Sequence, residues 1–197
     1  MSLSKGKLLV FSAPSGAGKT TIVRSVLKEF PELAFSISAT TRKKRETEVD
    51  GEHYFFITEA EFKKKVDNDE FVEWEKFYDY YYGTLKSHIE DLIDNGINVV
   101  LEVDVKGALN IKQVYPDSVL IFVMPPSFDT LKERLIKRNT ESEEDLSKRL
   151  ERVELELSYK DKFENIIVND DLEKAKNEAK NIIKNILNGV RNGNSTN

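Results

Sequence analysis

The chain has 197 residues, of which 39% are hydrophobic and 33% are charged, and its formal net charge is −5. This length fits one domain with a small inserted lobe, and the negative charge argues against a nucleic-acid partner. No apolar run approaches the roughly 20 residues that a membrane span needs, so we expect no membrane partner. The sequence contains no cysteine, which excludes disulfides and thiolate metal sites and favours a cytoplasmic location.

The first predicted element is a short buried strand at residues 8–11, and it leads into a turn rich in small residues and then a helix that begins at Lys19. This order of strand, glycine-rich turn and helix is typical of a phosphate-binding loop. Its glycines let backbone N–H groups converge on an anion at the positive end of the helix dipole. Lys19 would then reach the β- and γ-phosphates, and the Thr20 hydroxyl would hold Mg²⁺. Ala13 stands where the strict pattern has glycine, which only requires a negative φ there.

The next predicted elements are short. We expect a strand at residues 34–39, a basic turn at 40–45, a strand at 53–57 and a helix capped by Thr58, with Glu61 completing a capping box. Apolar and acidic residues then alternate at 71–77, and a helix at 85–93 ends before Gly96. These short strands and helices differ from the regular alternation of strand and helix on either side. Residues 35–94 are therefore predicted to form an inserted lobe of mixed α+β structure.

Strands and helices alternate again after the lobe. We predict strands at 98–103, 119–123 and 165–168, and helices at 107–114, from Ser127 to Arg138 and at 172–187. The alternation indicates an α/β fold, a parallel sheet covered by helices on both faces. Residues 4–34 and 95–190 would form this core, with a helical lid at 138–150 and a disordered tail at 191–197.

Three groups of charged residues indicate chemistry. Arg42 and Arg45 lie in one turn and can fork onto a single phosphate, although a solvated basic loop is the alternative. Glu73, among aromatic residues, can accept two hydrogen bonds from a guanine edge, a donor pair that adenine lacks. Glu102 and Asp104 lie near the carboxyl end of a predicted strand, where parallel sheets bind ligands, so they can orient Mg²⁺ waters or hold a substrate. A solvated strand end is the alternative.

The predicted lid is flanked by arginines. Arg134, Arg138 and Arg149 bracket a polar segment at residues 140–145. Arginines on a moving flap suit the charge that develops on a transferring phosphoryl group. The alternative for any one of them is a surface pair with a nearby glutamate.

Several stretches together resemble the guanylate kinase family, in its order and spacing, from about residue 8 to 187: SAPSGAGKT, SATTRKKR, EFVEWEKF, YYGT, LEVDVKGA and VNDD. The resemblance implies a P-loop enzyme that transfers the γ-phosphoryl group of ATP to GMP, and also to dGMP, with ATP and Mg²⁺ as cofactors. Departures from the family pattern are Ala13, Thr84 for the common serine, Glu102 where aspartate also occurs, and Asn139 for the usual lid glycine.

The resemblance also implies roles for individual residues. The implied GMP-binding residues are Ser38, Arg42, Arg45, Tyr54, Glu73, Tyr82, Thr84 and Glu102. The implied ATP-binding residues are Ala13, Pro14, Ser15, Gly16, Ala17, Gly18, Lys19, Thr20, Thr21, Arg134, Asn169 and Asp170. The implied catalytic residues are Lys19, Arg42, Arg134, Arg138 and Arg149, and the implied metal contacts are Thr20 and, through water, Asp104.

Two other functions remain open from the sequence. A kinase for a different nucleoside monophosphate would share the phosphate loop, but Glu73 suits guanine. A non-enzymatic guanylate-kinase-like interaction module would share the fold, but such modules tend to lose residues such as Lys19 and the lid arginines, which this chain has. The expected partners are the small molecules GMP and ATP, and the protein is a monomer or a homodimer.

Overall fold

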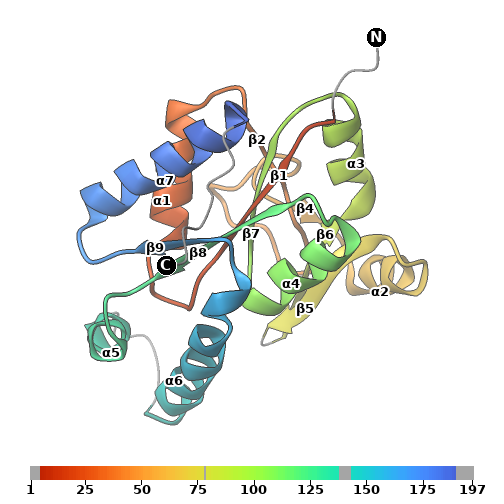
Figure 1. Ribbon diagram of the computed structural model, residues 1–197. Helices are drawn as coiled ribbons and strands as arrows, with labels where there is room; N and C mark the ends of the chain where they lie inside the picture. The colour runs from red at the N-terminus through yellow and green to blue at the C-terminus, as the bar shows by residue number, and fades with distance from the viewer. Residues whose placement is uncertain (1–4, 78, 138–142, 190–197) are drawn as a thin grey trace. The chain divides into compact units, whose positions relative to one another are not determined.

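The computed structural model describes residues 5–77, 79–137 and 143–189 (Figure 1). Its contacts divide the chain into two compact units. The first contains the chain up to residue 10 together with 32–120, and the second contains 11–31 and the chain from 121 onward. The boundaries fall inside β1 (Leu8–Ser12) and β8 (Val119–Met124). They differ from those of the predicted lobe at 35–94, which stays a prediction.

The first sheet has five strands in the order β2-β7-β1-β8-β9. Besides β1 and β8, its members are β2 (Ala34–Phe35), β7 (Val99–Val103) and β9 (Asn165–Val168). All five residues of β1 are buried, as a continuous apolar run in a parallel sheet requires. β2 pairs with β7 in parallel, and so does β8 with β9. The predicted α/β class is confirmed.

The second sheet has the order β4-β3-β6-β5 and mixes parallel and antiparallel pairs. Its strands are β3 (Ala39–Thr40), β4 (Phe55–Phe56), β5 (Phe71–Phe77) and β6 (Tyr80–Leu85). The single strand predicted at 34–39 is therefore wrong. Its two ends belong to different sheets, and the chain crosses between them at residues 36–38 without a glycine or proline to mark the break.

Helix α2 (Glu59–Asp67) packs on the second sheet. The predicted capping box is confirmed, because the Thr58 side chain accepts from the Glu61 backbone N–H and the Glu61 carboxylate accepts from the Thr58 backbone N–H. The Phe62 ring stacks on Phe71 of β5 with centroids 4.4 Å apart, in a core shared with Ala39. This core fixes β5 and β6 from one side.

Two further helices belong to the first unit, α3 (Lys86–Asp94) and α4 (Val105–Val114). The chain leaves α3 through Gly96, whose φ of 76° is the left-handed conformation that glycine adopts readily. The side chain of Asp104 accepts a hydrogen bond from the Gly107 N–H and caps α4. The helix therefore begins two residues before the predicted start at Gly107.

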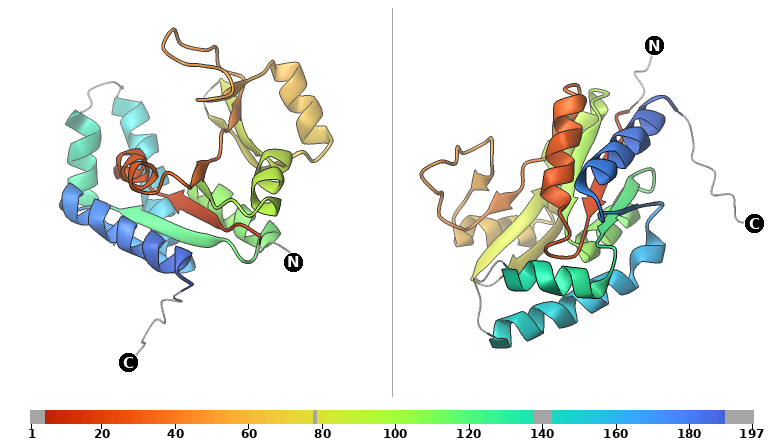
Figure 2. Two further views of the ribbon diagram at one scale, coloured as in Figure 1. Left: turned by 90° about the horizontal axis from the view of Figure 1, so that it is seen from above. Right: turned by 90° about the vertical axis from the view of Figure 1, so that its left-hand side faces the viewer.

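The second unit contains α1 (Lys19–Glu29), α5 (Phe128–Lys137), α6 (Glu143–Ser158), a short 3₁₀ turn (Lys160–Lys162) and α7 (Leu172–Leu187). α1 and α7 lie side by side in every view (Figures 1 and 2). α5 and α6 share a small apolar core made by Leu131, Leu135 and Val153. The Ser127 hydroxyl accepts from the Thr130 N–H and caps α5, as predicted.

Some predictions fall on parts of the chain that the structure does not describe. Arg138, Asn139 and the start of the predicted lid lie outside the described residues, as does the predicted tail at 191–197. Within the described residues, no helix has both the length and the apolar content needed to cross a membrane.

Candidate active site

The turn after β1 has the backbone of an anion-binding loop. Gly16 and Gly18 adopt φ values of 90° and 96°, and Gly18 is the N-terminal cap residue of α1. Among the described residues, Asp69 is the sole non-glycine residue with a positive φ. Ala13 therefore sits outside the left-handed region, and alanine is tolerated where the strict pattern has glycine.

Two close approaches explain why glycine occupies positions 16 and 18. A Cβ added at Gly16 would lie 3.0 Å from the Leu135 side chain and 3.2 Å from that of Leu131. A Cβ added at Gly18 would collide with the side-chain amide of Asn169. The loop thus rests on the leucines of α5 and on the residue that follows β9.

Asn169 connects three parts of the second unit. Its backbone N–H donates to the Met124 carbonyl at 2.7 Å, and its side-chain Nδ2 donates to the Ala17 carbonyl in the loop, also at 2.7 Å. Its own carbonyl accepts from Arg134 Nη2 at 3.0 Å. The Asn169 side chain is 5% exposed and Ala17 is fully buried. The structure therefore brings Asn169, Arg134 and the loop together, through a hydrogen bond that sequence reasoning missed.

The other predicted residues of this unit occupy the ends of helices and strands. Lys19, Thr20 and Thr21 form the first turn of α1, where helix N-termini favour anions. Asp170 follows Asn169 and is exposed, and Arg149 is half-buried on α6. Arg138 lies outside the described residues.

In the first unit, Glu73 of β5 and Thr84 of β6 face each other in register. The Thr84 hydroxyl donates to Glu73 Oε1 at 2.5 Å. Thr84 is 2% exposed and Glu73 is half-buried, so this bond fixes one carboxylate oxygen beside a buried hydroxyl. The β5 register shifts between Phe71 and Glu73, which re-aims the Glu73 side chain as β-bulges do.

Helix α4 approaches the same carboxylate. A Cβ added at Gly107 would lie 3.0 Å from Glu73 Oε2 and 3.0 Å from Asp104 Oδ1. The Gly107 N–H donates to Asp104 Oδ1 at 2.7 Å. Glycine at this position therefore leaves room for two carboxylates beside one turn of helix. Sequence reasoning did not single out Gly107.

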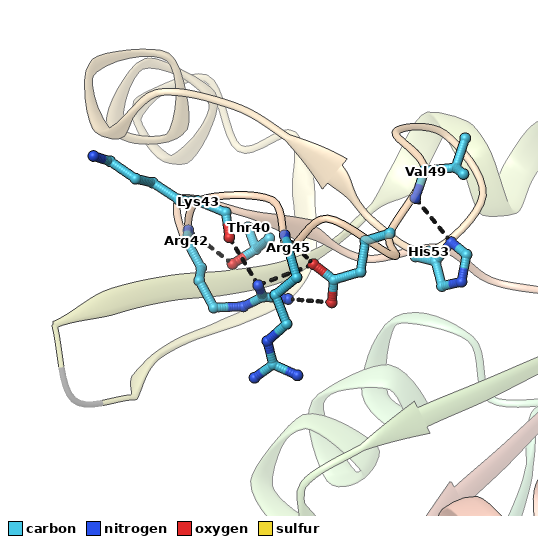
Figure 3. Close-up of polar contacts among 7 residues, drawn as sticks. Thr40, Arg42, Lys43, Arg45, Val49 and His53 are labelled. Atoms are coloured by element: carbon cyan, nitrogen blue, oxygen red, sulfur yellow. Dashed lines mark hydrogen bonds and ion pairs between the residues drawn. The ribbon is translucent and has the colours of Figure 1, made fainter.

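Arg42 is held by an acidic residue that the sequence analysis missed. Its Nη2 donates to Glu48 Oε1 at 2.8 Å, and its Nη1 donates to Glu48 Oε2 at 3.0 Å and to the Lys43 carbonyl at 2.8 Å (Figure 3). Glu48 Oε2 also accepts from the backbone N–H of Arg45 at 2.8 Å. These bonds to Arg42 and then to the Arg45 backbone lower the pKa of Glu48 to about 2, so the carboxylate stays charged at neutral pH.

Aromatic rings line the same arginine. The Arg42 guanidinium lies over the rings of Tyr54 and Phe56, 5.4 Å and 5.7 Å from their centroids. Tyr54 and Tyr82 meet edge to face at 6.1 Å. Burial raises the pKa of Tyr54, and nearby Tyr82 and the charges of Glu48 and Glu102 add to the rise. The structure thus brings Arg42, Tyr54, Tyr82 and Glu102 into one neighbourhood.

A family model described as Guanylate kinase matches residues 5–186, which is most of the chain. The chain belongs to the guanylate kinase family. Curated guanylate kinases from Thermotoga maritima and Caldanaerobacter subterraneus subsp. tengcongensis are 50% and 47% identical to it over 171 and 176 residues. These alignments cover 87% and 89% of this chain and 83% and 85% of the relatives.

A solved structure agrees with the sequence relatives. The crystal structure of guanylate kinase from Anaplasma phagocytophilum matches this structure with a TM-score of 0.72 at 29% identity. The match covers 93% of this chain and 87% of the other. Family membership thus extends over both units.

The guanylate kinase resemblance assigned Ser38 and Thr84 to guanine, and β6 connects them to the phosphate-side residues. Tyr82 and Thr84 are two positions apart on this strand and therefore face the same side. Ser38 immediately precedes β3, which pairs with β6 through Thr40 and Tyr82. The pair β3 and β6 thus carries residues predicted to contact guanine and residues predicted to contact the GMP phosphate. These roles stay predictions.

Within the described residues, no group of three or more His, Cys, Asp or Glu side chains gathers as a metal ion would need. The predicted metal contacts are instead one hydroxyl, Thr20, and one carboxylate, Asp104. Thr20 belongs to the second unit and Asp104 to the first, and each supplies an oxygen donor of the kind that Mg²⁺ prefers. Their shared role stays a prediction.

Proposed function

We infer that the protein is an ATP:GMP phosphotransferase that converts ATP and GMP into ADP and GDP. The observation that carries this conclusion is the family match along residues 5–186. It is supported by an intact phosphate loop and by the Glu73–Thr84 pair. The reaction on dGMP, the use of Mg²⁺ and the cytoplasmic location are parts of the same proposal, and the last is supported by the absence of cysteine.

The proposed reaction is an in-line displacement. An oxygen of the GMP phosphate attacks the γ-phosphorus of ATP, and the bond to the bridging oxygen of ADP breaks. Because the attacking group is already an anion near pH 7, no general base is needed. Catalysis then consists of positioning and charge neutralisation. Mg²⁺ held by Thr20 and, through water, by Asp104 would supply neutralisation of the phosphate charge.

Residues of the two units would divide the work. Lys19 and the loop N–H groups would bind the phosphates of ATP, while Arg134, Arg138 and Arg149 would cover the transferring group. Arg42, Arg45 and Tyr54 would hold the phosphate of GMP. Glu73 would accept hydrogen bonds from guanine N1–H and N2–H₂, while the Thr84 hydroxyl donates to its Oε1 and holds the carboxylate in place. A base without that donor pair would cover a half-buried carboxylate and remove water from it without offering two donors in return, which costs binding energy.

The test is ADP production from ATP·Mg with GMP, dGMP, AMP, UMP or dTMP supplied separately. Turnover confined to the guanine nucleotides is expected. Turnover with another monophosphate would keep the kinase chemistry and overturn the assignment of Glu73. No turnover with any of them, from folded protein that binds GMP, would favour the interaction module.

A second arm of this test addresses the phosphate loop. Lys19→Ala should abolish turnover while GMP binding stays measurable. Unchanged turnover in this variant would remove Lys19 from the mechanism.

A further inference from the structure

One carboxylate joins the two arginines assigned to the acceptor phosphate. Glu48 accepts two hydrogen bonds from the Arg42 guanidinium and one from the Arg45 backbone N–H. The side chains of Arg42 and Glu48 are only 14% and 12% exposed. The pair is therefore well shielded from solvent, unlike an ordinary surface ion pair that contributes little.

The contacts of Arg42 fix the orientation of its guanidinium. Three of its hydrogen bonds go to Glu48 and to the Lys43 carbonyl, out of the five N–H groups that a guanidinium carries. Its planar face meets the rings of Tyr54 and Phe56. Side chain, backbone and ring contacts thus hold a group that is otherwise flexible, and a group that is already ordered loses less entropy on binding.

A phosphate could meet this arginine in two ways. It could displace Glu48 from the Nη1–Nη2 edge, or it could bind beside Glu48, next to the side-chain hydrogen bond that Arg42 shares with Tyr82. Displacement would break two bonds to Arg42 and would also remove the acceptor of the Arg45 N–H. It would leave a shielded carboxylate without these partners, and an unmet charged group is costly. Binding beside a retained Glu48 is therefore favoured.

The Arg45 side chain completes the arrangement. Its backbone N–H donates to Glu48, while the residue itself is exposed to solvent. Glu48 thus orients both arginines. It holds Arg42, six positions before it, through the side chain, and Arg45, three positions before it, through the main chain.

We propose that Glu48 is a positioning residue for the acceptor phosphate, holding Arg42 and Arg45 as a preformed pair without touching the substrate itself. The inference rests on the proposed function, in which these arginines bind the phosphate of GMP. It predicts that Glu48 matters for the phosphate of the ligand and not for its base.

The experiment compares GMP with guanosine as ligands of the wild type and of Glu48→Gln. Isothermal titration calorimetry measures the binding of both ligands without a reporter group. Without Glu48, two arginine side chains would have to be ordered on binding, so the affinity for GMP should fall by about 5- to 100-fold. The affinity for guanosine and the KM for ATP should stay unchanged.

Two further variants sharpen the comparison. Glu46→Gln removes an exposed carboxylate two residues away in the same loop and should leave the affinity for GMP unchanged. Glu48→Asp retains a shorter carboxylate and should lose less affinity for GMP than Glu48→Gln, and it also serves if the latter does not fold. In an Arg42→Lys background, Glu48→Gln should have a smaller effect than in the wild type, because only the contact with the Arg45 main chain remains to be lost.

The inference is overturned if Glu48→Gln binds GMP as tightly as the wild type, or more tightly, because Glu48 would then be neutral or a competitor of the phosphate. It is also overturned if guanosine and GMP weaken equally, which would indicate a general disturbance of the unit. Failure of the proposed function is distinguishable from failure of this inference, because in that case the wild type itself would not phosphorylate GMP.

Discussion

The hydrogen bond from Asn169 to Ala17 is the most informative contact to remove. In Asn169→Ala the Ala17 carbonyl loses its donor at a fully buried position, while the Arg134 bond is retained because it uses the Asn169 main chain. An unsatisfied buried acceptor costs about 1–3 kcal/mol. Since 1.4 kcal/mol corresponds to about tenfold in an equilibrium constant, the native loop conformation should become about 5- to 150-fold less favoured.

Two measurements follow from this magnitude. The KM for ATP should rise by about 5- to 150-fold, by the same conversion, and the KM for GMP should not, because the assigned GMP residues belong to the other unit. The melting temperature should fall by about 2–4 °C for each kcal/mol lost. Asn177→Ala, on the exposed side of α7, is the control of the same residue type and should change neither quantity.

Inorganic tripolyphosphate separates two roles for Asn169. If the side chain orders the phosphate loop, Asn169→Ala should weaken tripolyphosphate and ATP to a similar degree. If it contacts the adenine part of ATP instead, the affinity for ATP should fall and the affinity for tripolyphosphate should not. An unchanged KM for ATP would refute the reasoning, even if the melting temperature fell.

Two other predictions concern the first unit. Gly107→Ala places a methyl group 3.0 Å from carboxylate oxygens of both Glu73 and Asp104. The KM for GMP should therefore rise, even though alanine stabilises a helix by about 1 kcal/mol relative to glycine. Asn110→Ala on the same helix is the control, and an unchanged KM for GMP in Gly107→Ala would contradict the close approach. The Glu48 carboxyl has its pKa lowered from 4.5 to about 2, chiefly by Arg42, so its contribution to stability is present above about 4.5 and is lost as the pH falls to about 2. Denaturant unfolding should show wild type and Glu48→Gln separated by a constant gap between pH 6 and 8 that narrows below pH 4.5, and a gap that persists to pH 2 would exclude the ion pair as its cause.

Local patterns predicted the regular elements well. The capping box at Thr58 and Glu61, the strand Asn165–Val168 and the helix Leu172–Leu187 were all readable, because caps and apolar periodicity act over a few residues. The strand predicted at 34–39 failed because alternation continues through residues that leave one sheet for another. Nothing in the local sequence identifies the partner strand.

The missed site contacts have a different cause. The bond from Asn169 to Ala17 joins residues 152 positions apart, so only the fold brings them together. Glu48 was closer to being predictable, since an acidic residue six positions after Arg42 in a basic loop is a visible signal. The contact of Gly107 with Glu73 depends on the absence of a side chain, which a list of charged residues does not reveal.

The crossing between the two sheets sets a limit on movement. β2 ends at Phe35 and β3 begins at Ala39, and four extended steps of chain span at most about 13–14 Å. Ala39 at the start of β3 can therefore never move farther than this from Phe35 at the end of β2, whatever the ligand. Any rearrangement of β3 relative to β2 is confined within this radius, and lengthening the connection would enlarge the conformational space open to β3.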